Sequence, residues 1–120
     1  MPDLFDSIEL IVDLPEKRLY AGMEGAIVEV LRDGVAYEVE FDPTDDDDLN
    51  LHALEPDQFI VVWRNATREP VPLADQIAQI VARLPQEAAT EVLDFARYLS
   101  VRAARRRQEP IRTLATAETS

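Results

Sequence analysis

Carboxylates are the most abundant side chains in this sequence that could perform chemistry, and one run of them stands out. Four consecutive aspartates form this run: Asp45, Asp46, Asp47 and Asp48. Oxygen-rich loops can bind calcium, but a calcium loop needs alternating ligands and a closing bidentate glutamate, and neither is present. Because adjacent aspartates repel one another, we interpret the run as a solvated acidic surface that faces a protein partner, without a metal.

The other groups that could catalyse a reaction are isolated from one another. His52 is the only histidine, and the sequence around it offers no nucleophile and carboxylate to complete a triad. Glu38 and Glu40 alternate with apolar residues, so they share the wet face of a strand and do not form an acid–base pair in unlike surroundings. The chain has no cysteine, which excludes a thiolate metal site and a cysteine nucleophile. We therefore expect no enzyme activity, no catalytic residue and no cofactor.

Two further groups allow either a binding role or a purely structural one. The aromatic residues Tyr20, Tyr37, Phe59 and Trp63 could line a binding groove of the SH3 type. Because so small a domain needs large side chains in its core, we expect most of them to be core residues. Arg105, Arg106 and Arg107 could contact nucleic acid. Three arginines at the end of a helix more often complement its dipole and aid solubility.

Charge is distributed unevenly along the chain. Residues 1–64 contain 17 acidic and 4 basic side chains, a net of −13, whereas residues 65–120 contain 7 and 8, a net of +1, and together these give the total of −12. The acidic half should repel nucleic acid and attract a basic protein surface. The N-terminus lacks the pattern of a secretory signal, and no apolar run reaches the roughly 20 residues that span a bilayer. With the absence of cysteine, this predicts a cytoplasmic protein.

Short β-rich runs fill residues 1–64, and turn residues separate them. The strands are expected at 7–12, 26–31, 35–41, 49–54 and 58–63. Asp33-Gly34 between two such runs is a strong hairpin signal, and Gly22 and Gly25 permit a tight bend before the second run. This spacing predicts a small five-stranded antiparallel SH3-like barrel over residues 1–64.

Residues 73–107 are expected to form two amphipathic helices, hinged at Pro85, so that the whole chain is α+β. Two prolines and no periodicity mark residues 65–72 as an extended linker, and residues 108–120 are expected to be a disordered tail. The helical hairpin is too short to bury its own apolar stripe. Three occupants could cover the stripe: the chain's own barrel, a second copy, or another protein. We favour a second copy, and another protein next.

Two segments resemble known bacterial families. The strings LPEKRLYAGMEGAIVEVL, YEVEF and ALEPDQFIVVW, within residues 4–63, resemble an uncharacterised family of small SH3-like domains and are more distantly similar to KOW-type barrels. The string LADQIAQIVARLPQEAATEVLDFARYL, residues 73–99, resembles a helical segment of antitoxin-like proteins. The second resemblance implies a partner-binding or dimerising element beside a toxin. Neither resemblance implies a catalytic residue.

We therefore predict a non-enzymatic protein-interaction module, antitoxin-like, that neutralises or scaffolds a partner such as a basic toxin. The acidic barrel would steer the partner, and residues 73–107 would form a homodimer or higher oligomer. The expected interface residues are apolar and helical: Ile77, Ile80, Val81, Leu84, Val92, Phe95, Ala96 and Leu99. The alternatives are a KOW-like module that binds RNA or ribosomal protein, and an accessory subunit of an enzyme.

Overall fold

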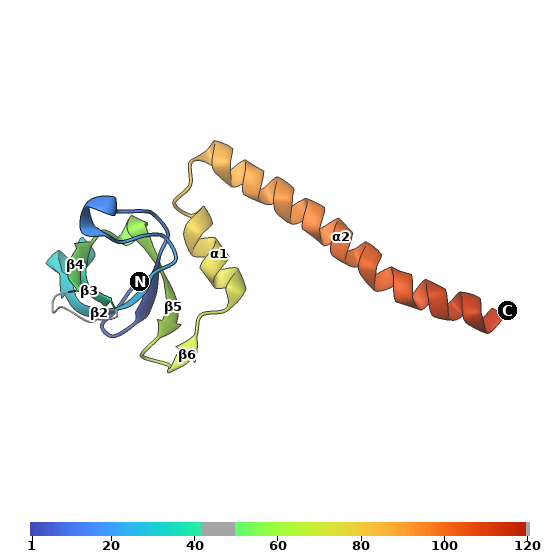
Figure 1. Ribbon diagram of the computed structural model, residues 1–120, viewed down its shortest axis with the longest axis horizontal. Coiled ribbons are helices and arrows are strands. Elements are labelled where there is room, and N and C mark those ends of the chain that lie inside the picture. Colours follow the sequence, from blue (N-terminus) through green and yellow to red (C-terminus); the bar gives the residue numbers. More distant parts are fainter. Residues whose placement is uncertain (42–49, 120) are drawn as a thin grey trace. The chain divides into compact units, whose positions relative to one another are not determined.

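The computed structural model describes residues 1–41 and 50–119, with side chains through residue 108 (Figure 1). The acidic run Asp45 to Asp48 lies outside the described residues, so its predicted role stays a prediction. The chain divides into two compact units, Met1–Arg83 and Leu84–Ser120. We call them the sheet unit and the helix unit.

The sheet unit contains one six-stranded antiparallel sheet in the order β4-β3-β2-β1-β5-β6. Its strands are β1 (Ser7–Leu10), β2 (Glu24–Leu31), β3 (Ala36–Phe41), β4 (Leu51–Leu54), β5 (Phe59–Arg64) and β6 (Glu69–Pro70). The expected fold was a closed five-stranded barrel, and that expectation was wrong. Among the described residues β4 and β6 are the edges of an open sheet.

The predicted hairpin between the second and third strands is confirmed. β2 and β3 pair antiparallel up to Leu31 opposite Ala36, and the short 3-10 turn Arg32–Gly34 joins them. Gly34 has a φ of 98°, which glycine adopts without steric cost. Gly25 serves a different purpose, because a Cβ there would lie 2.7 Å from the carbonyl oxygen of Glu40. The strands can approach this closely only because residue 25 has no side chain.

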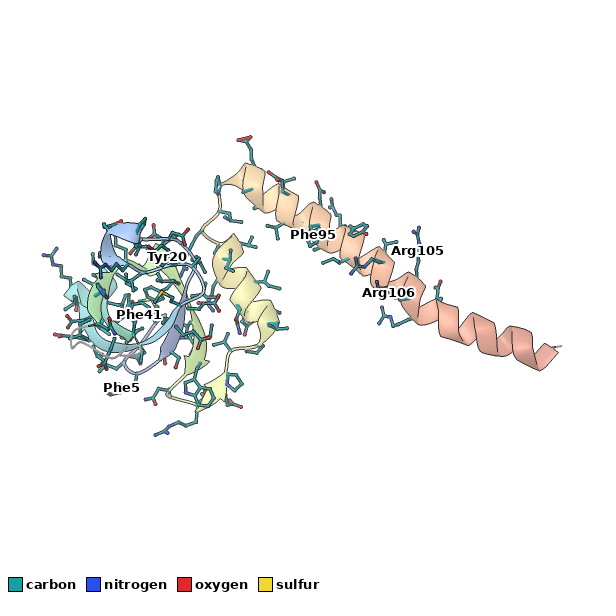
Figure 2. The ribbon with its side chains drawn as sticks, viewed as in Figure 1. Phe5, Tyr20, Phe41, Phe95, Arg105 and Arg106 are labelled. Carbon is teal, nitrogen blue, oxygen red and sulfur yellow. The ribbon has the colours of Figure 1, made fainter. Side chains whose placement is uncertain are left out.

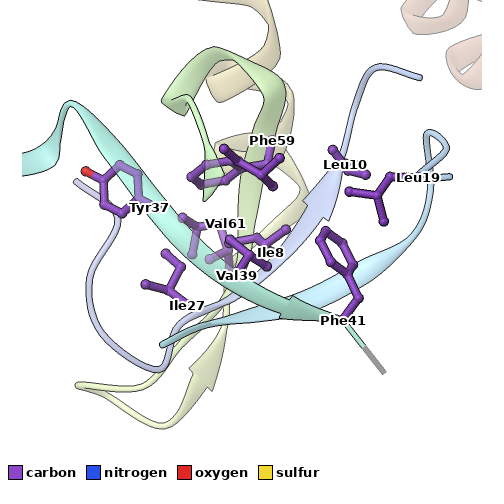
Figure 3. Packing of buried hydrophobic residues seen from close by; sticks show 11 residues of the cluster. Ile8, Leu10, Leu19, Ile27, Tyr37, Val39, Phe41, Phe59 and Val61 are labelled. Atoms are coloured by element: carbon purple, nitrogen blue, oxygen red, sulfur yellow. The ribbon is translucent and has the colours of Figure 1, made fainter. Parts of the chain in front are cut away.

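The core lies on one face of the sheet, where alternate strand residues meet (Figure 3). On β3, Tyr37, Val39 and Phe41 are buried, in agreement with the period of two in the sequence. Tyr37 and Phe59 pack edge to face, with ring centroids 5.6 Å apart. These two aromatic residues are therefore core residues, whereas Tyr20 and Trp63 are exposed, so the core prediction holds for two of the four aromatic residues.

The segment expected to be a linker is part of the sheet unit. After a turn, β6 pairs with the end of β5, with Trp63 opposite Pro70 and Arg64 opposite Glu69. Val71 is buried, and its N–H donates to the carbonyl oxygen of Val62 at 2.9 Å. A strand of two residues has too short a pattern to be recognised in the sequence.

Two helices follow, α1 (Leu73–Val81) and α2 (Gln86–Thr119), and Pro85 precedes α2 as expected. The two-helix hairpin was predicted as one module, but α1 belongs to the sheet unit, because the boundary between the units falls at Leu84. Residues 108–120 were expected to be disordered, whereas α2 continues through Thr119. The sequence after Gly34 contains no glycine that would end a helix, and alanines after residue 100 favour it, although Pro110 within α2 lacks a backbone N–H and disfavours it.

Candidate protein-interaction surfaces

Helix α1 covers the edge of β5 that β6 leaves free. The side-chain amide of Gln79 accepts from the N–H of Val61 at 2.8 Å and donates to its carbonyl oxygen at 2.9 Å. One side chain thereby makes both hydrogen bonds that a neighbouring strand would make. Arg83 also donates to the carbonyl oxygen of Phe59, and burial lowers the pKa of this guanidinium. An uncovered edge strand can pair with other chains, so α1 protects the sheet.

The predicted interface residues fall into two groups because the helices belong to different units. On α1, Ile77 is 53% exposed, and Ile80 and Val81 are half-buried, as is Leu84 after the helix. On α2, Phe95 is 62% exposed, Ala96 is exposed, and Val92 and Leu99 are half-buried. Much of α1 packs against β5, so the more exposed apolar surface lies on α2.

Six apolar residues of α2 lie along one stripe that runs for four turns of the helix, while Leu93, Tyr98 and Val101 are exposed outside it. We define the α2 stripe as Ala89, Val92, Phe95, Ala96, Leu99 and Ala103. Phe95 projects from the helix (Figure 2). Its ring stacks on that of Tyr98 with centroids 6.1 Å apart. The guanidinium of Arg102 lies 5.7 Å from the centre of the Tyr98 ring. Large exposed apolar side chains gathered in this way are typical of a protein-binding face.

A second surface is acidic and lies on the face of the sheet opposite the core. Strand pairing places Glu9 directly across from Glu24, and Glu29 directly across from Glu38. Glu40 lies on the same face as Glu38, as their spacing predicted. We call these five residues the acidic sheet face. Directly opposed like charges destabilise a sheet, so this arrangement costs stability. The sequence showed the carboxylates, but their opposition depends on a strand register that it did not reveal.

Reversing one of these charges should make the protein more stable. In Glu38→Lys, the repulsion with Glu29 becomes an attraction, and we expect the free energy of unfolding to rise by about 0.5–1 kcal/mol at low salt. Urea denaturation at low and at high salt measures the effect, which salt should diminish. Glu16→Lys is the matched control, because exposed Glu16 lies in the 3-10 turn Pro15–Lys17 between β1 and β2 and is not part of a strand pair. An equal gain in both variants would point to net charge as the cause.

Asp6 is the one buried acidic residue among the described residues. It connects the N-terminus to the end of β5 through hydrogen bonds and an ion pair. It is 1% exposed, and its carboxylate accepts from the backbone N–H groups of Asp3 and Asn65, both at 2.9 Å. Arg64 forms an ion pair with it at 3.3 Å and also donates to the carbonyl oxygen of Met1 at 2.7 Å. The group is fully hydrogen-bonded and structural. Sequence reasoning missed it because Asp6 and Arg64 are far apart in the chain.

His52 lies on the edge strand β4, where its ring tilts against that of Phe41 at a centroid distance of 6.1 Å. Partial burial, and secondarily the charge of Lys17, lower the pKa of His52 below its ordinary value. The Lys17 ammonium donates to the carbonyl oxygen of Ala53 at 3.1 Å and so caps this edge of the sheet. Among the described residues, the neighbours of the ring are Phe41, which packs against it, and the charge of Lys17.

The lowered pKa gives a pH dependence with a defined sign. Below pH 6.5 the unfolded chain binds more protons at His52 than the folded chain does, so stability should fall as the pH falls through this range. An NMR titration of the single histidine should give a pKa below 6.5. Lys17→Met should raise that pKa, since it removes the neighbouring charge. An unchanged value in Lys17→Met would show that burial alone lowers the pKa.

The described residues contain no arrangement typical of an active site. A small hollow between β6 and the start of α1 is lined by Arg64, Thr67, Glu69, Asp75 and Gln79 among others. Two of its polar groups are already engaged, Arg64 with Asp6 and Gln79 with Val61. No group of three or more histidine, aspartate or glutamate side chains in residues 1–41 and 50–108 could hold a metal ion. No helix in the described part of the chain has the length and apolar character needed to cross a membrane.

Comparison with known proteins bears on the sheet unit only. Residues 4–61 match the model of a domain of unknown function, DUF4926. The match includes all five residues of the acidic sheet face and the buried Asp6, and it ends within β5, before β6 and both helices. Neither the curated proteins nor the solved structures give a significant match to this chain.

Proposed function

We propose that this chain is a non-enzymatic protein-interaction module, antitoxin-like in organisation, that works in the cytoplasm. The observation that carries the proposal is the α2 stripe, whose most prominent side chain, Phe95, is 62% exposed. A helix of this kind gains most of its stability when its apolar face packs against something. An amphipathic helix that is laid into a groove or against another helix is a recurrent mode of protein recognition.

The charge of the sheet unit supports a basic protein as the partner to be neutralised. Residues 1–83 contain 19 acidic and 6 basic side chains, a net of −13. The acidic sheet face retains opposed carboxylates at a cost in stability, which is expected if they serve association. Charges of one sign on one partner raise the rate of encounter with an oppositely charged one. The same field opposes the phosphate backbone of RNA, and so disfavours the KOW-like alternative.

The acidic sheet face and the α2 stripe would have different roles in binding the partner. Carboxylates of the sheet unit would steer the partner, and the apolar stripe would supply buried area, with Phe95 and Leu99 as the large side chains. Inhibition would be by occlusion of the partner's own site, which requires no catalytic group on this chain. The resemblance of residues 73–99 to a helical segment of antitoxin-like proteins agrees with this role.

Co-expression tests the proposal. The product of the gene adjacent to its own should arrest growth when expressed alone, and the full chain should relieve that arrest. Leu99→Asp should abolish the relief, because it places a charge in the stripe. The matched control is Val101→Asp, which introduces the same charge at an exposed position on the opposite side of α2. A harmless neighbour, no relief by the full chain, or equal relief by both variants would contradict the proposal.

A further inference from the structure

We propose that the α2 stripe is covered by α2 of a second copy of this chain, and that the two helices run antiparallel. This inference rests on the proposed function and names the occupant of the same surface. Three features of α2 support this pairing: the spacing of the stripe, the order of the charges along the helix, and the position of two of those charges on one side of it.

The spacing of the stripe is that of paired helices. Ala89, Ala96 and Ala103 are seven residues apart, and so are Val92 and Leu99. Together they alternate at three and four residues, which is the repeat that keeps one seam of a helix facing a partner helix. A flat surface or a pocket needs no such repeat over four turns. The distance between packed helix axes depends on the side chains at the contact, and the three alanines allow a close approach.

The charges along α2 change sign at the middle of the stripe. Residues 86–96 contain three acidic side chains and no basic one, namely Glu87, Glu91 and Asp94. Residues 97–107 contain five arginines and no acidic residue. Two parallel copies would therefore oppose acid to acid and base to base. Two antiparallel copies place the acidic half of each over the basic half of the other, so a second copy has the required complementarity built in.

Glu91 and Arg102 show how the pairing would be made. They are eleven residues apart, which is close to three turns, so they lie on the same side of the helix, beyond Phe95 at the edge of the stripe. A twofold axis midway between them, at residues 96 and 97, coincides with the centre of the stripe. It brings Glu91 of each copy to Arg102 of the other copy. Within the described part of the chain Glu91 has no ion-pair partner, whereas Asp94 is paired with Arg97 at 3.3 Å.

Charge reversal at these two positions tests both the occupant and the orientation. Sedimentation equilibrium of the full chain should show a dimer. Glu91→Arg alone and Arg102→Glu alone should each raise the dissociation constant about tenfold, because each creates two repulsive contacts. The double variant Glu91→Arg/Arg102→Glu restores both cross-chain pairs with exchanged signs, and its dissociation constant should return toward that of the wild type. Circular dichroism of each variant checks that α2 remains helical.

The outcomes separate this inference from the proposed function. In a parallel pair, Glu91→Arg and Arg102→Glu would not act on one another, so a double variant no tighter than the single variants overturns the antiparallel arrangement. A wild-type chain that remains monomeric at every concentration overturns the second copy as the occupant. If that monomer still relieved growth arrest in co-expression, the stripe would bind a foreign protein and the proposed function would stand. A dimer without relief would leave the inference standing and remove the function.

Discussion

Asp6→Ala is expected to lower the free energy of unfolding by about 3 kcal/mol, a large part of the stability of a domain of this size. The substitution leaves the backbone N–H groups of Asp3 and Asn65 without their acceptor, and it removes the only ion-pair partner that the described residues offer Arg64. Buried polar groups that lose a partner account for most of such losses. Urea denaturation followed by the fluorescence of Trp63, the single tryptophan, measures the change.

Two further variants make the Asp6 result specific. Asp6→Asn retains the shape and one acceptor oxygen but loses the charge, so its loss should lie between zero and that of Asp6→Ala. Glu16→Ala, at an exposed carboxylate, should change the free energy of unfolding by less than about 0.5 kcal/mol. If Asp6→Ala were no worse than Glu16→Ala, the hydrogen bonds at Asp6 would not hold the N-terminus to β5.

Gln79→Glu is expected to detach α1 from β5, with a loss of roughly 2 kcal/mol at neutral pH. The carboxylate can still accept from the N–H of Val61, but its second oxygen is placed against the carbonyl oxygen of Val61, where Gln79 donates at 2.9 Å. Stability should recover as the pH falls, because a protonated carboxyl can donate again. Chemical denaturation at pH 7 and at a pH near 4 measures both parts of the prediction.

The consequence of Gln79→Glu beyond stability is exposure of the β5 edge. The amides of β5 should exchange faster with solvent, and the variant should aggregate more readily, because a free edge can pair with other chains. Gln86→Glu is the matched control, since Gln86 is exposed and lies in the first turn of α2, outside the sheet unit. Unchanged exchange at Val61 in the Gln79→Glu variant would mean that α1 is not what protects the edge.

Features set by neighbouring residues could be predicted from the sequence, and features set by strand register could not. The Asp33-Gly34 hairpin and the buried alternation of Tyr37, Val39 and Phe41 are local, and both were predicted correctly. The opposition of Glu29 to Glu38 follows from a register shift between Ile27 and Glu29, which no local pattern encodes. For that reason the acidic sheet face was not recognised as a site before the structure.

The contacts of the helices could likewise not be predicted from local sequence patterns. The apolar repeat of residues 73–84 predicted a helix correctly, but it did not reveal what the helix covers. That depended on β5 having a free edge and on Gln79, a polar residue outside the apolar stripe, reaching Val61. The closed barrel was predicted wrongly for a related reason, since closure requires edge strands to pair, and the short strand β6 takes part of the edge of β5 instead.

The central claim is that the stripe of α2 binds a protein, and that its first occupant is a second copy of the chain. Sedimentation equilibrium of three full-length proteins over a wide concentration range tests it most directly. The wild type and Val101→Asp should sediment at twice the chain mass of 13.6 kDa, and Leu99→Asp should sediment at 13.6 kDa. Three monomers at the highest concentration, or a Leu99→Asp variant that remains a dimer, would contradict the account.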